Sequence, residues 1–132
     1  MIVFITTCSM VKKGKGDPIR QYKWDYKGIP ELLRTRKKVL ETMKSSLKRP
    51  VEGPDFGGNL SDGEYLRAFQ RYGEGDFIRG LESSGADLKT WVDNNQLFFI
   101  SALYGLVHSK EPIQNYDLEL DDKISKVWKE SN

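Results

Sequence analysis

Two short runs of consecutive apolar residues stand out from the mixed pattern of this chain. They are residues 2–7, IVFITT, and residues 97–102, LFFISA, and both are rich in β-branched or aromatic side chains. Continuous runs of this kind are typical of strands that are buried on both faces, as in a parallel sheet. We therefore predict two buried strands that lie side by side and run in the same direction.

A longer segment, residues 30–48, has its apolar residues at helical spacing. Pro30 suits the first turn of a helix, and Glu31 complements the positive end of the helix dipole. We predict a helix over the whole segment, with its apolar face in the core. On the opposite face we place the cations Arg34, Arg36, Lys37, Lys38, Lys44 and Lys48.

Shorter helices are predicted from the same spacing in the rest of the chain. In the first of them, Ser61 and Glu64 form a capping-box pattern, and apolar residues then follow on one face as far as Tyr72. The others are predicted near residues 77–85, near residues 88–93 and at residues 121–129.

The alternation of strands with helices predicts an α/β domain. We expect a single domain over residues 1–132, in three layers, with a mostly parallel sheet and helices on both faces. Two strands rarely make a stable sheet, because three or more are normally needed. Three explanations stay open: further strands near residues 22–27 or 50–58, a shortened version of a larger domain, or a partner that completes the sheet.

The composition narrows the setting of the protein. Hydrophobic residues make up 38% of the chain and charged residues 30%, as in typical soluble domains. No apolar run approaches the roughly 18 residues that span a bilayer, and the amino-terminal residues do not resemble a secretory signal. The single cysteine cannot form an internal disulfide. We therefore expect a cytoplasmic protein that does not associate with membranes.

The net charge of +2 hides a strong asymmetry along the chain. Residues 1–49 contain 13 Lys or Arg and 4 Asp or Glu, which gives +9, whereas residues 50–132 contain 8 and 15, which gives −7. A basic half is suited to contact with phosphate groups. The simpler alternative is a solvated helix surface, since runs of charge are usually ordinary surface.

Both predicted strands end in loops that carry polar residues or glycine. In open α/β sheets, ligands bind outside the carboxyl ends of the strands, and the ends of two parallel neighbours meet at one edge. We expect the later loop that contains Tyr116 and Asp117 to fold back over this edge. The candidate binding residues are Cys8, Ser9, Lys12, Lys13, Ser101, Tyr104, Gly105, Tyr116 and Asp117, with Arg71 and Tyr72 at a helix end.

Each of these residue types has a functional and a structural interpretation. Lys12 and Lys13 could hold phosphate, and Lys12 could act as a nucleophile if burial or a neighbouring cation kept its amine neutral. Tyr104 could stack on a base, or it could be a core tyrosine with a hydrogen-bonded hydroxyl. Tyr116 and Asp117 could bind sugar hydroxyls or a base edge, or they could form a turn.

Known motifs add little to these candidates. The stretch KKGKG, residues 12–16, lacks the spacing of a P-loop, although its backbone N–H groups could bind an anion. Cys8 is either a small buried residue or, with His108, part of a reactive pair. One cysteine and one histidine do not supply the three or four ligands that zinc usually takes. We predict no metal site and no cofactor.

Two stretches of the chain, AFQRYGEGDFIRGL and FFISALYGLVHSKEPIQNYDLEL, form a recognisable pattern. An aromatic-glycine segment precedes a strand that ends in Leu-Tyr-Gly, and Pro-Ile and Tyr-Asp-Leu follow. This pattern resembles the YaaA family of peroxide-stress proteins and its smaller relatives. The matching residues are Phe69, Arg71, Tyr72, Gly75, Ser101, Leu103, Tyr104, Gly105, Leu106, Pro112, Ile113, Tyr116, Asp117, Leu118 and Trp128.

The amino-terminal stretch FITTCSMVKK is similar to the strand-Cys-Ser-x-x-Lys opening of the smaller relatives. Cys8 and Lys12 also have the spacing of the Cys-x-x-x-Lys motif of archaeosine synthase, in which a lysine attacks a modified base. The two resemblances together cover residues 1–14 and 65–129.

These resemblances imply three functions. The YaaA pattern implies a protein that binds nucleic acid, DNA more readily than RNA, and that limits oxidative damage. The archaeosine synthase spacing implies an enzyme that acts on a nucleobase or nucleotide, with Lys12 as nucleophile or anion holder and Asp117 assisting proton transfer. Larger YaaA-like proteins continue with further strands and helices, which suggests as a third hypothesis a domain that mainly binds a protein partner. The sequence does not predict an oligomeric state.

Overall fold

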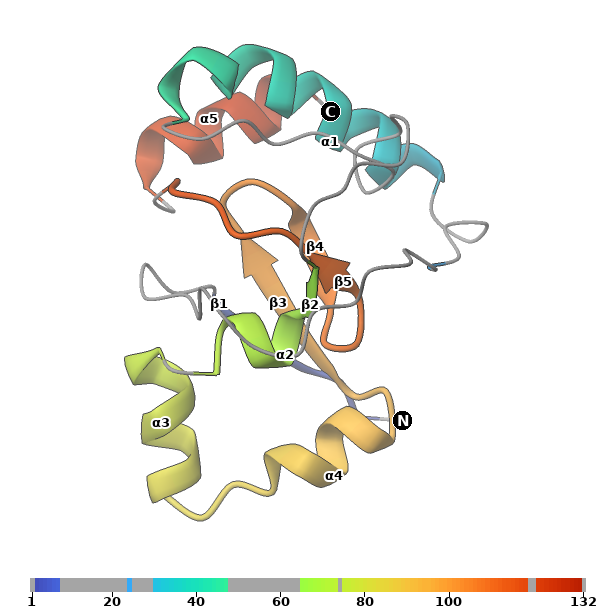
Figure 1. Cartoon of the computed structure of the whole chain (residues 1–132), viewed down its shortest axis with the longest axis vertical. Helices are drawn as coiled ribbons and strands as arrows, with labels where there is room; N and C mark the ends of the chain where they lie inside the picture. The colour runs from blue at the N-terminus through green and yellow to red at the C-terminus, as the bar shows by residue number, and fades with distance from the viewer. Residues whose placement is uncertain are drawn as a thin grey trace.

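A small mixed sheet with helices gathered near both of its ends forms the protein (Figure 1). The computed structural model describes residues 2–7, 24, 30–47, 65–73, 75–118 and 121–131. In chain order the elements are β1 (Phe4–Thr7), α1 (Pro30–Met43), the 3-10 helix η1 (Lys44–Ser46), β2 (Leu66–Arg67), α2 (Ala68–Arg71), α3 (Asp76–Ser83), α4 (Leu88–Asp93), β3 (Leu97–Ser101), β4 (Gly105–His108), β5 (Pro112–Ile113) and α5 (Asp122–Ser131).

The two predicted strands are confirmed as β1 and β3, and they are parallel neighbours. The prediction that both are buried on both faces is wrong for β1, in which Ile5 is 60% exposed. Phe4 lies opposite Leu97, and Thr7 lies opposite Ile100. The two strands therefore end at the same edge of the sheet, β1 at Thr7 and β3 at Ser101. This is the arrangement on which the predicted binding edge depends.

The sheet is mixed, so the prediction of a mostly parallel sheet is wrong for the described strands. β4 pairs antiparallel with β3, with Ser101 opposite Gly105, and the strand order is β1-β3-β4. Gly105 has a φ of 71°, which glycine adopts without the steric cost that other residues pay, and it lets the chain turn back directly after β3. The α/β composition is confirmed, but the described helices do not form a clear three-layer arrangement with the sheet.

The additional strands were not predicted where they occur. β2 and β5 form a separate two-stranded antiparallel sheet, in which Leu66 lies opposite Ile113. Of the two positions where further strands were expected, residues 50–58 lie outside the described residues. So do residues 22–27, with the exception of Trp24, which is not in a strand.

The helix predicted from Ser61 to Tyr72 is wrong over residues 65–67. Leu66 and Arg67 are extended, and the helix that follows them, α2, has only four residues. The backbone N–H groups of Ala68 and Phe69 donate to the carbonyls of Glu111 and Ser109, each at 2.9 Å. These long-range hydrogen bonds replace the local ones of a helix. Ser61 and Glu64 lie outside the described residues.

The other predicted helices are confirmed with shifts of a few residues at their ends. The helix expected over residues 30–48 is α1 followed by η1, which ends at Ser46. α3 is followed by Gly85, which has a φ of 93°, and α4 is followed by Asn95, which has a φ of 58°. Asp87 caps α4 by accepting a hydrogen bond from the backbone N–H of Thr90.

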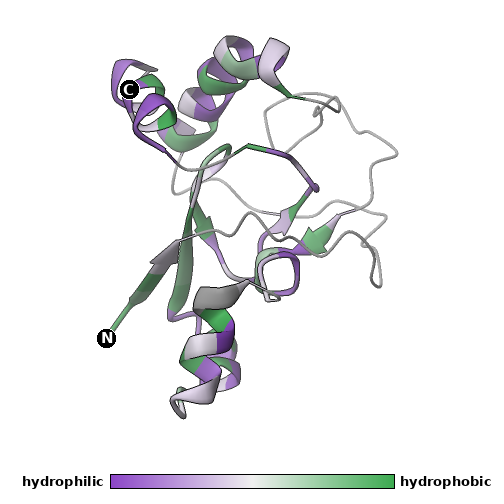
Figure 2. Cartoon of the chain, turned by 90° about the vertical axis from the view of Figure 1, so that its left-hand side faces the viewer, coloured by the Kyte–Doolittle hydropathy of each residue, from purple (hydrophilic) through white to green (hydrophobic). Residues whose placement is uncertain are grey.

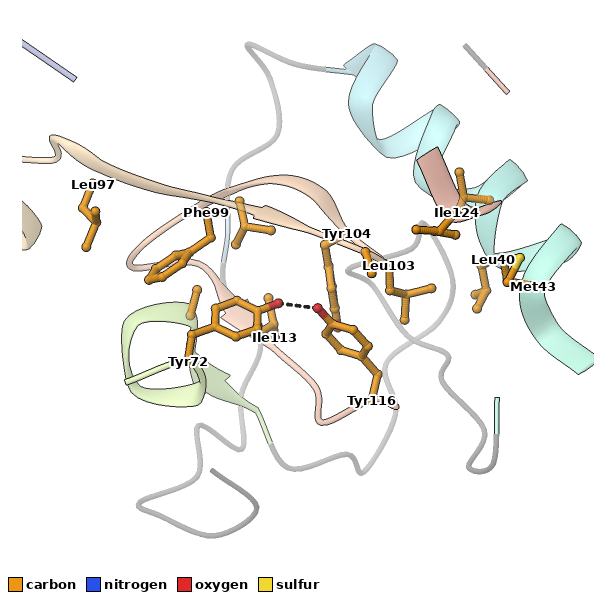
Figure 3. Close-up of a cluster of buried hydrophobic side chains, with 14 of the residues drawn as sticks. Leu40, Met43, Tyr72, Leu97, Phe99, Leu103, Tyr104, Ile113, Tyr116 and Ile124 are labelled. Atoms are coloured by element: carbon orange, nitrogen blue, oxygen red, sulfur yellow. Dashed lines mark hydrogen bonds between the residues drawn. The ribbon is translucent and has the colours of Figure 1, made fainter. Parts of the chain in front are cut away.

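The core lies on one face of the sheet and extends under the helices (Figure 3). In the sheet it is formed by Leu97 and Phe99 of β3 and Val107 of β4, which the strand register places on the same face. From the helices come Val39, Leu40 and Met43 of α1, Ile78, Val92 and Ile124. Figure 1 shows α1 and α5 together near the carboxyl end of β3, and α3 and α4 near its amino end.

One residue of α1 contradicts the predicted division of that helix into an apolar and a cationic face. Arg36 is completely buried, although it was placed among the outward cations. It precedes Val39, Leu40 and Met43 by three, four and seven residues, which is the spacing of residues on one helical face. Arg34, Lys37, Lys38 and Lys44 are exposed, as predicted.

Among the residues that the structure describes, no helix is both long enough and apolar enough to cross a membrane.

Candidate functional site

The predicted site residues divide into a described group and a group outside the description. Cys8, Ser9, Lys12 and Lys13 lie outside the described residues, so their positions stay predictions. The last described residue before them is Thr7, whose partner across the parallel pair is Ile100.

Three of the predicted residues are joined by a chain of buried hydroxyl groups, of which Figure 3 shows the bond between Tyr72 and Tyr116. The hydroxyl of Tyr116 lies 2.6 Å from Oγ of Ser101 and 2.7 Å from the hydroxyl of Tyr72. Oγ of Ser101 also accepts a hydrogen bond from the backbone N–H of Tyr104 at 3.0 Å. All four residues are buried, so these hydrogen bonds link β3, its following turn and two distant loops inside the protein.

Tyr104 lies in the interior, which corresponds to the structural interpretation of this residue. Its hydroxyl accepts a hydrogen bond from the backbone N–H of Gln114 at 2.9 Å, and its ring lies 5.7 Å from the ring of Tyr116. The side chain has no exposed surface, so it does not offer a ring face to a ligand in this structure.

Arg36 is a buried cation at the same end of β3 that the sequence did not assign to the site. Its Nε donates to the carbonyl of Tyr104 at 2.6 Å, and its Nη2 donates to the carbonyl of Leu106 at 2.9 Å. Nη2 also forms an ion pair with Glu111, at 2.9 Å to Oε2 and 3.2 Å to Oε1. The guanidinium thus joins α1 to the turn between β3 and β4. In the sequence, the signal for its burial was the helical spacing of Arg36 to the core residues of α1.

Gly105 lies in a turn, and it also contacts Trp128 of α5. A Cβ at this position would lie 2.5 Å from Cη2 of Trp128. Nε1 of Trp128 donates to the carbonyl of Ala102 at 2.8 Å. The absence of a side chain at Gly105 therefore lets the ring of Trp128 in α5 pack against the turn, in addition to permitting the positive φ.

Two cavities share the wall formed by Gly105, Leu106 and Trp128. The first has a volume of about 280 Å³ and is also lined by Ile100, Ser101 and Ser125. The second has a volume of about 400 Å³ and is also lined by Glu31, Leu32, Thr35 and Lys129. They form a concave region at the carboxyl end of β3, where α/β proteins keep their ligands.

The remaining predicted residues, Arg71 and Asp117, do not line the two cavities. Arg71 is buried, and its Nη2 donates to the carbonyl of Ile113 at 3.3 Å, which joins α2 to β5. Asp117 is half-buried and directly follows Tyr116 of the hydroxyl chain. The structure therefore brings the predicted residues of β3 and the Tyr116 loop together, but it places most of their side chains inside the protein.

His108 is half-buried on β4, away from the two cavities. Its ring centroid lies 5.1 Å from that of Phe98 and 5.2 Å from that of Trp24. Burial and, to a smaller extent, the charge of Lys110 hold the pKa of His108 below its ordinary value. Its Nδ1 accepts a hydrogen bond from the backbone N–H of Lys110 at 3.0 Å, which suits a neutral ring. The predicted pairing with Cys8 is untested, because Cys8 lies outside the described residues.

No group of three or more His, Cys, Asp or Glu side chains within the described ranges is arranged to hold a metal ion.

No family model matches the chain, and none of the curated proteins is significantly similar to it.

Proposed function

We propose that this protein binds a nucleic acid, DNA more readily than RNA, or a nucleotide-like ligand at the carboxyl edge of β1 and β3. The observation that carries the proposal is the parallel register of these strands, in which Thr7 lies opposite Ile100. Thr7, the last described residue before Cys8, Ser9, Lys12 and Lys13, lies opposite Ile100, which lines one of the two cavities.

The buried residues of the YaaA-like pattern have a positioning role in this proposal. Tyr72, Ser101, Tyr104 and Tyr116 are connected by hydrogen bonds beneath the edge. A rigid support of this kind holds loops in a defined geometry, which is what a binding site needs. Ligand contact then falls to other groups: the exposed Lys129 and, as predicted from the sequence, Lys12 and Lys13. A part in protection from peroxide stress follows from the same resemblance.

The charge distribution supports a polyanionic ligand. Four exposed cations lie on α1 and the adjoining η1, and residues Glu31, Leu32 and Thr35 of α1 line one of the two cavities. They are Arg34, Lys37, Lys38 and Lys44. One of them, Arg34, forms a 3.1 Å ion pair with Glu31, but both side chains are well exposed, so this pair is weak and open to exchange for a phosphate.

Binding of duplex DNA, single-stranded DNA and RNA at several salt concentrations tests the proposal. Affinity should fall steeply with salt, with a slope of about −0.9 for each phosphate contact on duplex DNA. The double variant Lys12→Ala/Lys13→Ala should reduce the affinity and make this slope shallower. The matched control is Arg79→Ala/Lys89→Ala, which removes two exposed cations from α3 and α4 at the other end of β3. No affinity for any of these polymers at low salt would refute nucleic-acid binding.

The enzyme hypothesis rests on the same edge. Lys12 would be the nucleophile or the anion holder, and Asp117, which follows Tyr116, would assist proton transfer. If Lys12 forms an imine with a nucleobase-derived substrate, reduction with borohydride should leave a covalent adduct on this residue. The variant Lys12→Ala should form no adduct, and the neighbouring Lys13→Ala serves as its control. Unchanged turnover in Lys12→Ala would remove the lysine from the mechanism.

A further inference from the structure

The large hydrophobic side chains that the structure leaves exposed gather at one side of the sheet. Among the described residues they are Ile2, which is 68% exposed, Val3 at 44%, Ile5 at 60% and Leu106 at 41%. Three of the four lie in or directly before β1. Figure 2 shows this strand at the outer side of the sheet, next to the N-terminus, with apolar residues along it.

Val3, Ile5 and Leu106 share one face of the sheet, opposite to the core. The register places Ile5 beside Phe98 and His108, and it places Thr7 beside Ile100 and Leu106. Because side chains alternate along a strand, Val3, Ile5 and Thr7 point to this open face, while Phe4 and Thr6 point to the core. Ile5 and Thr7 are exposed, whereas Thr6 is buried, as this alternation requires.

The backbone of β1 also has an outward edge. Among the described strands, β1 has β3 as its one neighbour. The N–H of Phe4 donates to the carbonyl of Gln96 at 2.7 Å, so Phe4 directs its backbone groups toward β3. Successive residues of a strand direct these groups to opposite sides. The N–H and C=O of Ile5 therefore point away from β3, in the position from which a further strand is bonded.

Residues 2–7 lack two of the devices that usually prevent association at a strand edge, a charged residue and a proline. Edge strands are commonly protected by a charged residue, a proline or a bulge. The first charged residue of the chain is Lys12, and residues 2–7 contain no proline. The absence is notable in a chain in which 30% of the residues are charged. An uncharged edge can meet an identical edge without electrostatic repulsion.

We propose that two copies of this chain associate through their β1 strands. The two strands would be antiparallel, and the two-fold axis would pass between the two Ile5 residues. A two-fold contact uses the same surface on both copies, so an outward, uncharged strand is complementary to itself. Ile5 would exchange two backbone hydrogen bonds with Ile5 of the second copy, Val3 would face Thr7, and Phe4 would face Thr6. The two three-stranded sheets would join into one sheet of six strands, and the exposed apolar residues would continue across the axis.

Cysteine cross-linking tests this register directly. In a Cys8→Ser background, Ile5→Cys should form a disulfide-linked dimer on mild oxidation. The Cα atoms of a hydrogen-bonded antiparallel pair lie about 5.5 Å apart, within the usual range for a disulfide of about 4.4–6.8 Å. Val3→Cys and Thr7→Cys should not cross-link singly, but the double variant should. Leu106→Cys is the matched control, because it is exposed on the same face but lies two strands from the axis.

A non-covalent measurement keeps the inference testable if these variants fold poorly. Analytical ultracentrifugation of the unaltered chain should show a dimer whose population rises with concentration. Ile5→Lys should raise the dimer dissociation constant by about tenfold or more, since two like charges would face each other across the axis. Leu106→Lys should leave the constant nearly unchanged.

A chain that stays monomeric at high concentration would overturn the proposal and would mean that another segment or another protein covers the edge. Equal cross-linking of all single cysteine variants would also overturn it, because random collision would then explain the disulfides. Neither result depends on nucleic-acid binding, so this interface and the proposed function can fail separately.

Discussion

The two ends of β3 are held by different kinds of interaction. At its carboxyl end, Oγ of Ser101 and the carbonyls of Tyr104 and Leu106 are bonded to buried polar side chains from other parts of the chain. At its amino end, Leu97 packs in an apolar cluster with Ile78 and Val92. The side-chain hydrogen bonds within α3 and α4 are local, such as those between Asp87 and Thr90. The long-range ones at this end, from Lys110 to the carbonyl of Asp93 and from Gln96 to the carbonyl of Ile2, are exposed.

The amino end also leaves space between its elements. A cavity of about 280 Å³ lies between α2, α3, α4 and β3, and its apolar lining includes Phe69, Ile78, Leu88 and Phe99. Apolar contacts have no preferred direction, so several arrangements of such residues have similar energies. Buried polar groups must find partners in the right direction, or they cost free energy. The carboxyl end is therefore held in one geometry, and it is the end where the proposed site lies.

The largest expected effect of a substitution is at Arg36. Arg36→Met should lower the free energy of unfolding by about 3–5 kcal/mol, because it leaves the carboxylate of Glu111 buried without its partner. The double variant Arg36→Met/Glu111→Leu should be less destabilised than the sum of the two single variants. Urea denaturation measures both, with exposed Lys37→Met as the control. A loss below about 1 kcal/mol in Arg36→Met would contradict a tightly held carboxyl end.

A second effect is expected at Gly105. Gly105→Ala should cost roughly 1–2 kcal/mol for the left-handed backbone and a further ~1–3 kcal/mol because Trp128 must move. Gly85→Ala is the matched control, since its φ is 93° but a Cβ there meets no atom within 4 Å. The difference in thermal or urea stability between the two variants isolates the contact with Trp128. Equal losses would mean that this contact does not constrain the turn.

The hydroxyl chain should contribute less than either of these. Tyr116→Phe removes the group that lies between Ser101 and Tyr72, and we expect a loss of about 1–3 kcal/mol. Tyr72→Phe and the double variant complete a cycle that measures the coupling of the two hydroxyls. Additive losses would show that the two hydroxyls act independently. In a DNA-binding assay, the loss of affinity in Tyr116→Phe would reveal whether the site depends on this support.

The smallest expected effect is a gain in stability at the other end of β3. Gly80 is exposed within α3, and a Cβ there meets no atom within 4 Å. Gly80→Ala should therefore stabilise the protein by about 0.5–1 kcal/mol, because alanine is the better helix former. Chemical denaturation should show this as a higher midpoint with an unchanged slope. A destabilised variant would indicate that α3 is more tightly packed than its surroundings suggest.

Local patterns in the sequence predicted the elements whose cause is local. The apolar runs predicted β1 and β3, and helical spacing predicted α1, α3, α4 and α5. Helical spacing failed at residues 65–67. There, the hydrogen bonds from the backbone N–H groups of the following Ala68 and Phe69 to the carbonyls of Glu111 and Ser109 outweigh it. The local patterns also missed β4, because a glycine turn can lead into a helix, a loop or a returning strand. A returning strand forms only if β3 has a free edge with which it can pair.

The meeting of the two strand ends was predicted, but the burial of the side chains around them was not. The argument from parallel strands correctly placed the ends of β1 and β3 together. The interior location of Tyr104 and Arg71 could not be read from residue type, since tyrosine and arginine serve both in cores and in binding sites. Arg36 was misplaced because a charged residue on an apolar face is rare, although its spacing to Val39 and Leu40 was available.

The sequence by itself determined the parallel strand pair, most of the helices, the charge asymmetry and the glycine turn after β3. Each follows from side-chain periodicity or from backbone freedom within a few residues. Only the tertiary structure decided that the sheet is mixed, that Arg36 meets Glu111 and that Ser101, Tyr116 and Tyr72 join beneath the strand ends. These contacts connect residues far apart in the chain, and their energies exist only when burial removes water from the polar groups and directs them to one another.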